Sequence, residues 1–452
     1  MKLLYHNETD KLGAFIGYVN DNICGDYIYD YPPRQAYRPI NPDDAMVQIK
    51  NSLEKSDELN LYFHFPFCKQ ICSYCNLFSI CETNGERFEE YFEELKKEVL
   101  FYKPYIQGKK INSVYLGGGT PSMIEAPLFK DFFDFIESEI GFSIRTVSEV
   151  AIEMSPDCAE PHYLSELVNI GINRINIGVQ AANDNELSCI GRHYTSELLH
   201  NSLTSVMNAG FKNVCVDLIY GLENQSFQMW KDSVKAVASY EPPTICAYPL
   251  TLRSNTGFAR RGYVEINGKM QYAKYEFARD YLLAHGYIQE THVRYKKENS
   301  HGGYIQKENH WKQQNILGFG AGARSYLKTI NVRNGYSIVN RRKAYNQYLS
   351  NIRTRGHAIT DGFLLSADER MRKLIVLGID GLDLSVFPKQ FGLYFEEHFE
   401  AEYKYLLQEG YMMRCGNSIR FTTKGSQYRD LIVQLFFSDY VNQTIADFSY
   451  NE

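Results

Sequence analysis

The stretch Leu61–Cys75, LYFHFPFCKQICSYC, places three cysteines directly after an alternating apolar run. The run is typical of a strand that ends near residue 65. Cys68, Cys72 and Cys75 follow it, separated by gaps of three and two residues. Zinc commonly takes four ligands, and no second cysteine pair follows here. Iron–sulfur clusters are held by thiolates, so the spacing favours a cluster with one iron left for a non-protein ligand.

Composition narrows the class of protein. The chain has 452 residues, more than the roughly 250 to 300 that one core supports, so we expect one large domain and a smaller one. Apolar residues make up 44% and charged residues 23%, as in an ordinary soluble protein. A net charge of -6 and a pI near 6.1 give no basic footprint for nucleic acid. We expect no nucleic acid partner.

The sequence also carries no strong targeting signal. The apolar run at the start is too short for the core of a secretory signal, and no segment approaches about 18 uninterrupted apolar residues. We therefore expect a cytoplasmic protein without a membrane span. Ten cysteines are too sparse for a disulfide scaffold in a chain of this length, so we expect free thiols.

Four segments differ in pattern. Residues 1–57 are rich in Pro and Tyr without a clear period, which predicts an extended N-terminal arm. Residues 58–300 alternate between short apolar strands and helices about six times, which indicates a parallel sheet with its site at the carboxyl ends of the strands. A glycine-rich connector at 301–360 is expected to complete the pocket. Residues 361–452 predict a small, mainly helical, winged-helix-like domain with a short hairpin.

One predicted helix shows the pattern most clearly. Over residues 86–102, Phe88, Phe92, Leu95 and Val99 recur at steps of three and four, and Glu and Lys occupy the other positions. Such spacing predicts an amphipathic helix packed on the sheet.

The cysteine loop resembles a known signature. C-x3-C-x2-C with Tyr74 before the third cysteine is similar to the motif of the radical S-adenosylmethionine (SAM) superfamily. The words YFHFPFC, YLGGGTPS, INIGVQ and DLIYGL, within about residues 60–435, resemble the oxygen-independent coproporphyrinogen III dehydrogenase family. The resemblance implies an α/β fold, a partial (β/α)6 barrel. It also implies a 4Fe-4S cluster on Cys68, Cys72 and Cys75 that cleaves SAM to a 5′-deoxyadenosyl radical.

The remaining cysteines are expected to be plain buried or surface thiols. These are Cys24, Cys81, Cys158, Cys189, Cys215, Cys246 and Cys415.

The resemblance also implies which residues hold the first SAM. Consecutive glycines let a backbone approach a ligand and offer N–H groups, and Gly118, Gly119 and Thr120 match the family's element for the SAM amino group. Glu153 ends a predicted strand, where its carboxylate could accept from a ribose or an ammonium group.

Three further residues match contacts to a second SAM in the family. These are Gln180, Arg192 and Asp217, each on a different strand-to-helix segment. Arg192 could bind a carboxylate with two parallel hydrogen bonds. Asp217 interrupts an apolar run, where a carboxylate without a partner would be costly. Three tyrosines match aromatic contacts to the SAM molecules: Tyr62, Tyr74 and Tyr248. The sequence does not identify a catalytic acid or base.

Three branches of the family remain open. Decarboxylases usually carry Gly and Cys after the third cysteine, where this chain has Asn76 and Leu77. Haem chaperones carry a His where this chain has Gln306, although His310 or His301 could substitute. The radical methyltransferases and cyclopropanases are favoured here, because the second-SAM residues fit a methyl donor.

The expected reaction is therefore C-methylation or cyclopropanation of an sp2 carbon, with decarboxylation or haem handling as alternatives. Substrates left open are a tetrapyrrole, an aromatic heterocycle and an alkene-containing metabolite. The resemblance also implies an electron donor of flavodoxin or ferredoxin type. A glycine-rich turn at Leu317–Leu327 is expected to line the far side of the pocket.

Overall fold

The computed structural model describes residues 5, 10–21, 23, 27–264, 268–298, 300, 303–337 and 339–448. The chain divides into two units. The larger spans 39–264, 274–362 and 450–452, and the smaller spans 1–38, 265–273 and 363–449. Cys24 and His301 lie outside the described residues.

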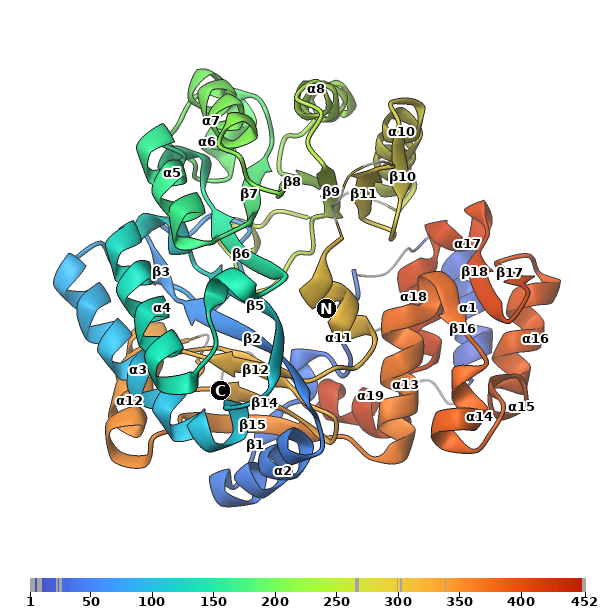
Figure 1. Ribbon diagram of the computed structural model, residues 1–452. Helices are drawn as coiled ribbons and strands as arrows, with labels where there is room; N and C mark the ends of the chain where they lie inside the picture. Colours follow the sequence, from blue (N-terminus) through green and yellow to red (C-terminus); the bar gives the residue numbers. More distant parts are fainter. Residues whose placement is uncertain are drawn as a thin grey trace. The chain divides into compact units, whose positions relative to one another are not determined.

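The larger unit is built on a sheet of thirteen strands, in the order β1-β15-β14-β13-β12-β2-β5-β6-β7-β8-β9-β11-β10 (Figure 1). Their bounds are β1 (Arg38–Pro39), β2 (Glu58–Phe65), β5 (Lys110–Gly118), β6 (Glu149–Met154), β7 (Arg174–Gln180), β8 (Asn213–Tyr220), β9 (Thr244–Pro249), β10 (Tyr287–Gln289), β11 (Arg294–Lys297), β12 (Ile316–Phe319), β13 (Arg324–Tyr326), β14 (Ile330–Asn334) and β15 (Ile359–Leu364).

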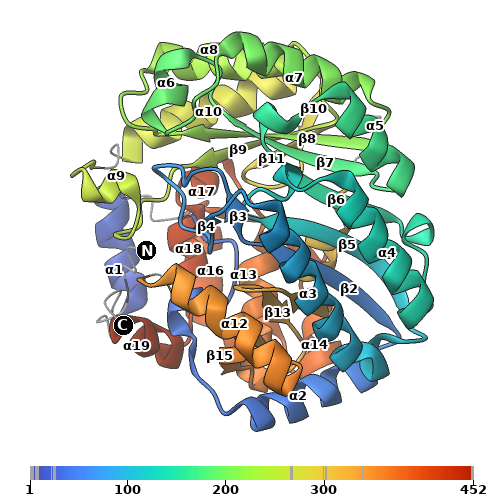
Figure 2. The ribbon, with the colours of Figure 1, turned by 90° about the vertical axis from the view of Figure 1, so that its left-hand side faces the viewer.

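The run from β2 to β9 is parallel throughout, and β12 adds to β2 in the same direction. Helices connect successive strands and cover the outer face of the curved sheet (Figure 2). Six parallel strands with these crossovers confirm the expected partial (β/α)6 barrel. The helices of this unit are α2 (Pro42–Glu54), α3 (Gly85–Ile106), α4 (Ala126–Ile140), α5 (Pro161–Ile170), α6 (Asp184–Cys189), α7 (Ser196–Asn208), α8 (Phe227–Ala238), α9 (Gly257–Arg260), α11 (Ile305–Trp311) and α12 (Arg341–Arg355), with α10 (Gly268–Ala284) shared between the units.

The smaller unit joins both ends of the chain. The amide of Ile28 donates to Asp430 Oδ1 at 2.9 Å, and Arg429 donates to the Ile28 carbonyl at 3.0 Å. Its sheet has the order β16-β18-β17. The elements are α1 (Lys11–Asn20), α13 (Ala367–Gly378), β16 (Leu382–Asp383), α14 (Val386–Phe391), α15 (Phe395–His398), α16 (Glu400–Gln408), β17 (Met412–Cys415), β18 (Ser418–Phe421), α17 (Thr423–Gln427), α18 (Arg429–Leu435) and α19 (Asp439–Ala446).

The N-terminal segment is not only an extended arm, as expected from its composition, because α1 and α2 lie within it. The side chain of Asn41 accepts from the amides of Asp43 and Asp44 and caps α2, with Pro42 in its first turn. Both are established helix-start signals, since they satisfy or remove donors that would otherwise lack partners.

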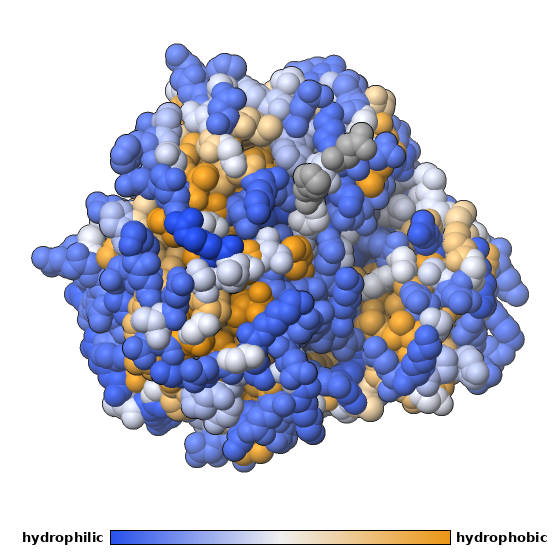
Figure 3. All heavy atoms as spheres, in the orientation of Figure 1, coloured by the Kyte–Doolittle hydropathy of each residue, from blue (hydrophilic) through white to orange (hydrophobic). Residues whose placement is uncertain are grey.

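Helix length and hydropathy bear on whether the chain could span a membrane. No helix within the described ranges is long and apolar enough to cross a bilayer. The face drawn in Figure 3 is mainly hydrophilic, with apolar residues confined to limited areas.

A buried carboxylate ties α3 to the rest of the larger unit. Glu98 Oε2 accepts from the amide of Gly320 and from the hydroxyl of Tyr348, each at 2.8 Å, and Oε1 accepts from Asn334 at 2.7 Å. Burial nevertheless raises the pKa of Glu98 to about 7. The folded protein therefore holds a proton here at pH values where the unfolded chain has lost it.

This pKa predicts a pH dependence of stability. Below the pKa of 4.5 that Glu98 has in the unfolded chain, the protonated carboxyl contributes its full share to the free energy of unfolding. This contribution is lost as pH rises to the folded-state pKa of about 7, a change of about 3 kcal/mol. We expect Glu98→Gln to flatten the decline of the unfolding free energy over this range, measured by denaturant unfolding at pH 5 to 8. Glu93→Gln, at an exposed site, is the matched control. An identical slope in Glu98→Gln and wild type would contradict the prediction.

Candidate functional site

The three clustered cysteines lie where β2 ends. Cys68 is buried in the short strand β3 (Phe67–Cys68), and Cys72 and Cys75 are half-buried in the following loop. The amide of Ser73 donates to the Ile190 carbonyl at 2.9 Å, which anchors the loop to the segment after β7. All three cysteines line one cavity of about 420 Å³.

The donor set of this loop is three thiols at gaps of three and two residues. Structural zinc commonly takes four protein ligands in two closely spaced pairs, whereas iron–sulfur clusters are held by thiolates. Burial raises the pKa of the Cys68 thiol to about 12, so a thiolate there needs a positive partner. This donor set fits a polynuclear iron–sulfur cluster better than a single zinc ion.

The glycine turn after β5 is required by close packing. Gly118 has φ +119°, and a Cβ there would lie 2.7 Å from the ring of His64. A Cβ on Gly119 would lie 2.4 Å from the carbonyl oxygen of Phe67, next to Cys68. Only glycine therefore allows the turn to approach the cysteine strand so closely.

The expectation that this turn offers free N–H groups is wrong. The amide of Gly118 donates to Glu153 Oε2 at 2.9 Å, while those of Gly119 and Thr120 donate to the carbonyls of Phe65 and Phe67. The turn is left with carbonyl oxygens to offer a ligand, and carbonyls suit an ammonium group because they accept hydrogen bonds.

Replacing Gly119 with alanine tests the coupling between the turn and the cysteines. The new methyl group would push against the backbone of Phe67, so we expect a loss of about 1 to 3 kcal/mol and a clear fall in bound iron. Iron content and thermal unfolding under anaerobic conditions measure both effects. Gly85→Ala is the control, because a Cβ there meets no atom within 4 Å. Wild-type iron content in Gly119→Ala would count against this coupling.

Glu153 lies at the end of β6 and lines the cavity. Its Oε1 accepts from the Tyr115 hydroxyl at 3.0 Å, and burial raises the pKa of its carboxyl. Tyr62 does not line the cavity. Its ring stacks on that of Tyr115 with centroids 5.9 Å apart, and its hydroxyl lies 2.9 Å from Nδ1 of His64. Tyr62 therefore packs on the tyrosine that donates to Glu153.

Gln180 has an unusual backbone at the end of β7. Its φ is +70°, and the register with β8 shifts between Gly178 and Gln180. A Cβ on Gly178 would lie 2.6 Å from Gln180 Nε2, so the amide of Gln180 folds back over the strand into space that a side chain at 178 would occupy. Non-glycine residues with positive φ are strained and cluster at functional sites. Gln180 lines the cavity, as the sequence analysis led us to expect.

Arg192 brings a positive charge to the same cavity. Its NH1 donates to Ser155 Oγ at 2.6 Å. Its Nε is buried and has no hydrogen-bond partner among the described residues. An unpaired buried donor is costly, so this guanidinium is suited to receive an acceptor such as a carboxylate.

Asp217 completes the set from β8 and also lines the cavity. Burial raises the pKa of its carboxyl well above the usual value. Tyr74 lines the cavity, whereas Tyr248 does not; both pack on an apolar cluster that includes Ile190 and Phe258.

Asn176 and Ser155 are among the cavity residues that were not predicted from the sequence. Asn176 lies on the same face of β7 as Gly178 and Gln180, and it donates to the Tyr115 hydroxyl at 2.8 Å. Ser155 follows β6 and holds Arg192. The period of two along a strand would have pointed to Asn176.

Residues 317–327 are not among those that line this cavity. The role of the connector in completing the substrate pocket therefore stays a prediction.

Comparisons with known proteins agree with this geometry. Residues 62–237 match the family model of the radical SAM superfamily. The heme chaperone HemW of Lactococcus lactis is 28% identical over 391 residues, covering 84% of this chain and 98% of that protein. HemW of Synechocystis sp. is 30% identical over 292 residues, covering 61% of this chain and 69% of that protein. The structure of coproporphyrinogen III oxidase (HemN) from Escherichia coli, a radical SAM enzyme, matches with a TM-score of 0.79 at 21% identity, covering 91% of this chain and 96% of that chain.

The fold and the cysteine loop thus define a radical SAM protein. The chain belongs to the radical SAM superfamily, in the family that contains HemW and oxygen-independent coproporphyrinogen III oxidase. Membership implies a 4Fe-4S cluster and SAM, whereas a second SAM stays a prediction. The placement beside the methyltransferases is not supported, because these relatives favour the two alternatives, coproporphyrinogen oxidation and haem handling.

Proposed function

We propose that this protein is a radical SAM enzyme that acts on a tetrapyrrole. Oxidative decarboxylation is the reaction that we favour. The observation that carries the proposal is the single cavity in which Cys68, Cys72 and Cys75 meet Glu153 and Arg192. Reductive cleavage of SAM requires the cluster and the groups that bind SAM to share one cavity. The tetrapyrrole class is supported by the names of the relatives.

The residues of the cavity have distinct roles in this proposal. When bound, the cluster and SAM supply a radical that removes a hydrogen atom from the substrate. Glu153 and the carbonyls of the glycine turn bind the ammonium and ribose groups of SAM, because they are acceptors. Arg192 binds a carboxylate through its unpaired Nε. The three cysteines, Cys68, Cys72 and Cys75, hold the cluster.

Haem handling is the second candidate, because HemW is a heme chaperone by name. The position of the expected haem ligand does not favour it. Gln306 is buried and accepts from Ser113 Oγ at 3.0 Å, and the ring of buried His310 lies edge-on to that of Tyr326 at 4.5 Å. Neither Gln306 nor His310 is among the residues that line the cavity.

Methyl transfer with a second SAM was the first expectation from the sequence. The experiment described below can also detect this reaction. Gln180, Arg192 and Asp217 are compatible with a second SAM, yet the same three groups suit the polar groups of one SAM or of a substrate. A flavodoxin- or ferredoxin-type electron donor and a cytoplasmic location stay part of the proposal.

One anaerobic experiment separates the three reactions. The reduced protein is supplied with coproporphyrinogen III and methyl-deuterated SAM. We expect carbon dioxide release and 5′-deoxyadenosine without deuterium, because the hydrogen comes from the substrate. Deuterium in 5′-deoxyadenosine would instead indicate attack on a SAM methyl group. In a parallel sample supplied with haem, stable haem binding without 5′-deoxyadenosine in either sample would indicate a carrier.

A further inference from the structure

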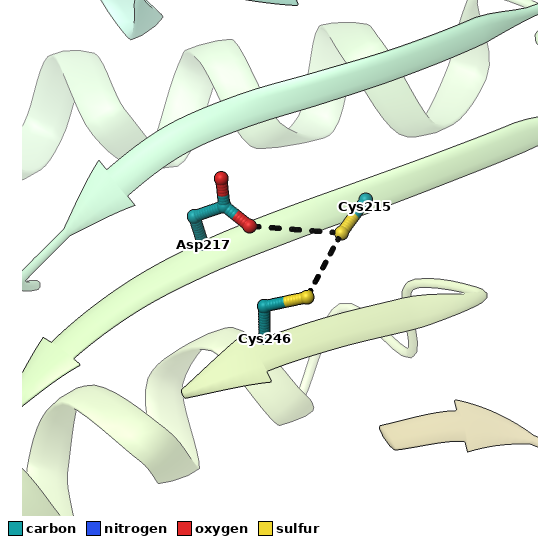
Figure 4. Close-up of side chains that lie close together, drawn as sticks. All are labelled: Cys215, Asp217 and Cys246. Carbon is teal, nitrogen blue, oxygen red and sulfur yellow. Dashed lines mark hydrogen bonds between the residues drawn. The ribbon is translucent and has the colours of Figure 1, made fainter. Parts of the chain in front are cut away.

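A second group of metal-ligating side chains lies inside the barrel, apart from the three clustered cysteines. Cys215 and Asp217 are two residues apart on β8, and Asp217 is paired in register with Cys246 on β9 (Figure 4). Residues two apart on a strand share a face, so Cys215 points to the same side as Asp217, which lines the cavity.

The three side chains converge closely. The thiol of Cys215 donates to Asp217 Oδ1 at 3.7 Å, and the Sγ atoms of Cys215 and Cys246 are 3.6 Å apart. One ligand atom from each residue lies within 4.8 Å of the other two. Cys215 and Cys246 are only 1% and 2% exposed. The cluster is therefore a buried group of two soft donors and one hard donor.

These distances match the edges of a tetrahedral site. With bonds of about 2.3 Å to sulfur and about 2.1 Å to oxygen, tetrahedral angles place two sulfurs about 3.8 Å apart and a sulfur and an oxygen about 3.6 Å apart. The corresponding separations here are 3.6 Å and 3.7 Å. We propose that Cys215, Asp217 and Cys246 form a binding site for one thiophilic divalent cation of the Zn²⁺ class, separate from the iron–sulfur cluster.

The surrounding charges support such a site. Two thiolates and a carboxylate around a divalent cation leave a net charge of -1, which a buried cation can balance. Arg174 is a buried arginine on β7, the strand next to β8, and its NH1 lies 3.7 Å from Glu149 Oε2. Its NH2 has no hydrogen-bond partner among the described residues.

A buried hydroxyl beside the group of Cys215, Asp217 and Cys246 also lacks a hydrogen-bond partner among the described residues. Thr244 lies in register with Cys215 and on the same face of β9 as Cys246. Its Oγ1 is buried without a hydrogen-bond partner in the described part of the chain. A cation with thiolate ligands would give this hydroxyl an acceptor, because second-shell donors commonly bond to metal-bound sulfur or oxygen.

The site would keep one coordination position open. Three protein ligands leave a tetrahedral ion with a fourth position for water or a substrate atom, as in catalytic zinc sites. Asp217 and Asn176 both line the cavity, so an oxygen or nitrogen donor of a molecule in that cavity could take this position. The cation would then act as an anchor or a Lewis acid for the substrate.

Zinc loading of the cluster-containing protein tests the proposal. The anaerobic protein is incubated with zinc, passed through a desalting column, and its zinc and iron are counted. We expect about one zinc per wild-type chain and a fall to near zero in Cys215→Ala and Cys246→Ala, with iron unchanged. Cys158→Ala, at a half-buried cysteine outside this group, should retain the zinc. Unchanged iron in these variants would show that the iron–sulfur cluster is intact. Loss of zinc would then be distinct from a failure of the proposed function.

X-ray absorption at the zinc edge of the loaded wild-type protein supplies a measurement that does not depend on variants. We expect two sulfur ligands at about 2.3 Å with oxygen or nitrogen completing the shell. A shell without two sulfurs, zinc retained in Cys215→Ala, or no zinc in the wild-type protein would each overturn the proposal.

Discussion

Replacing Cys72 with alanine should remove the iron–sulfur cluster and abolish SAM cleavage. Cys72 is half-buried in the loop after β3 and lines the same cavity as Cys68 and Cys75. The cluster has three protein thiolates by family resemblance, so the loss of one leaves two. We expect iron to fall from about four per chain to near zero and 5′-deoxyadenosine to fall to background.

The control is a nearby cysteine outside the cavity. Cys81 is exposed, and Cys81→Ala should keep both the iron and the activity. Iron counting and the absorption spectrum of anaerobically prepared protein report on the cluster independently of turnover. Full iron content in Cys72→Ala, or equal loss in Cys81→Ala, would show that the ligand assignment is wrong.

Replacing Arg192 with methionine should weaken SAM binding strongly while leaving the cluster in place. Methionine keeps much of the length and apolar volume but removes every donor. A hydrogen bond to a charged group contributes about 1.5 to 3 kcal/mol, which corresponds to a rise in the Kd for SAM of about 10- to 100-fold. Equilibrium binding of SAM to the anaerobic holoprotein measures this effect.

The matched control for Arg192 is another arginine near the cysteine loop. Arg261 pairs with Glu223 at 2.8 Å and donates to Ser73 Oγ, but it does not line the cavity. Arg261→Met should bind SAM nearly as wild type does. A Kd for Arg192→Met within twofold of the wild-type value would contradict a contact between Arg192 and SAM.

Much of the barrel and of the cavity could be predicted because local patterns agree with the fold. Phe88, Phe92, Leu95 and Val99 recur on one face, and all four are buried in α3. Parallel strands place their carboxyl ends at one edge of a sheet. Residues at the ends of different strands, such as Glu153 and Gln180, were therefore expected in one cavity, and the structure brings them there.

Features that depend on strand register could not be read from the sequence. The approach of Cys215 to Cys246 depends on the pairing of β8 with β9, which no local pattern specifies. The stacking of the Tyr62 ring on Tyr115 also depends on the pairing of β2 with β5, and the SAM contact of Tyr62 stays a prediction. Whether the amides of the glycine turn are free to bind a ligand also depends on tertiary contacts, because Glu153 accepts a hydrogen bond from the amide of Gly118.

The central claim is that this protein cleaves SAM to act on a tetrapyrrole, instead of only carrying one. The most direct test measures 5′-deoxyadenosine formed by the reduced anaerobic protein, with and without coproporphyrinogen III, beside Cys72→Ala. The account predicts formation by the wild-type protein that rises with substrate and is absent from the variant. Stoichiometric haem binding with no 5′-deoxyadenosine above the Cys72→Ala background would contradict it.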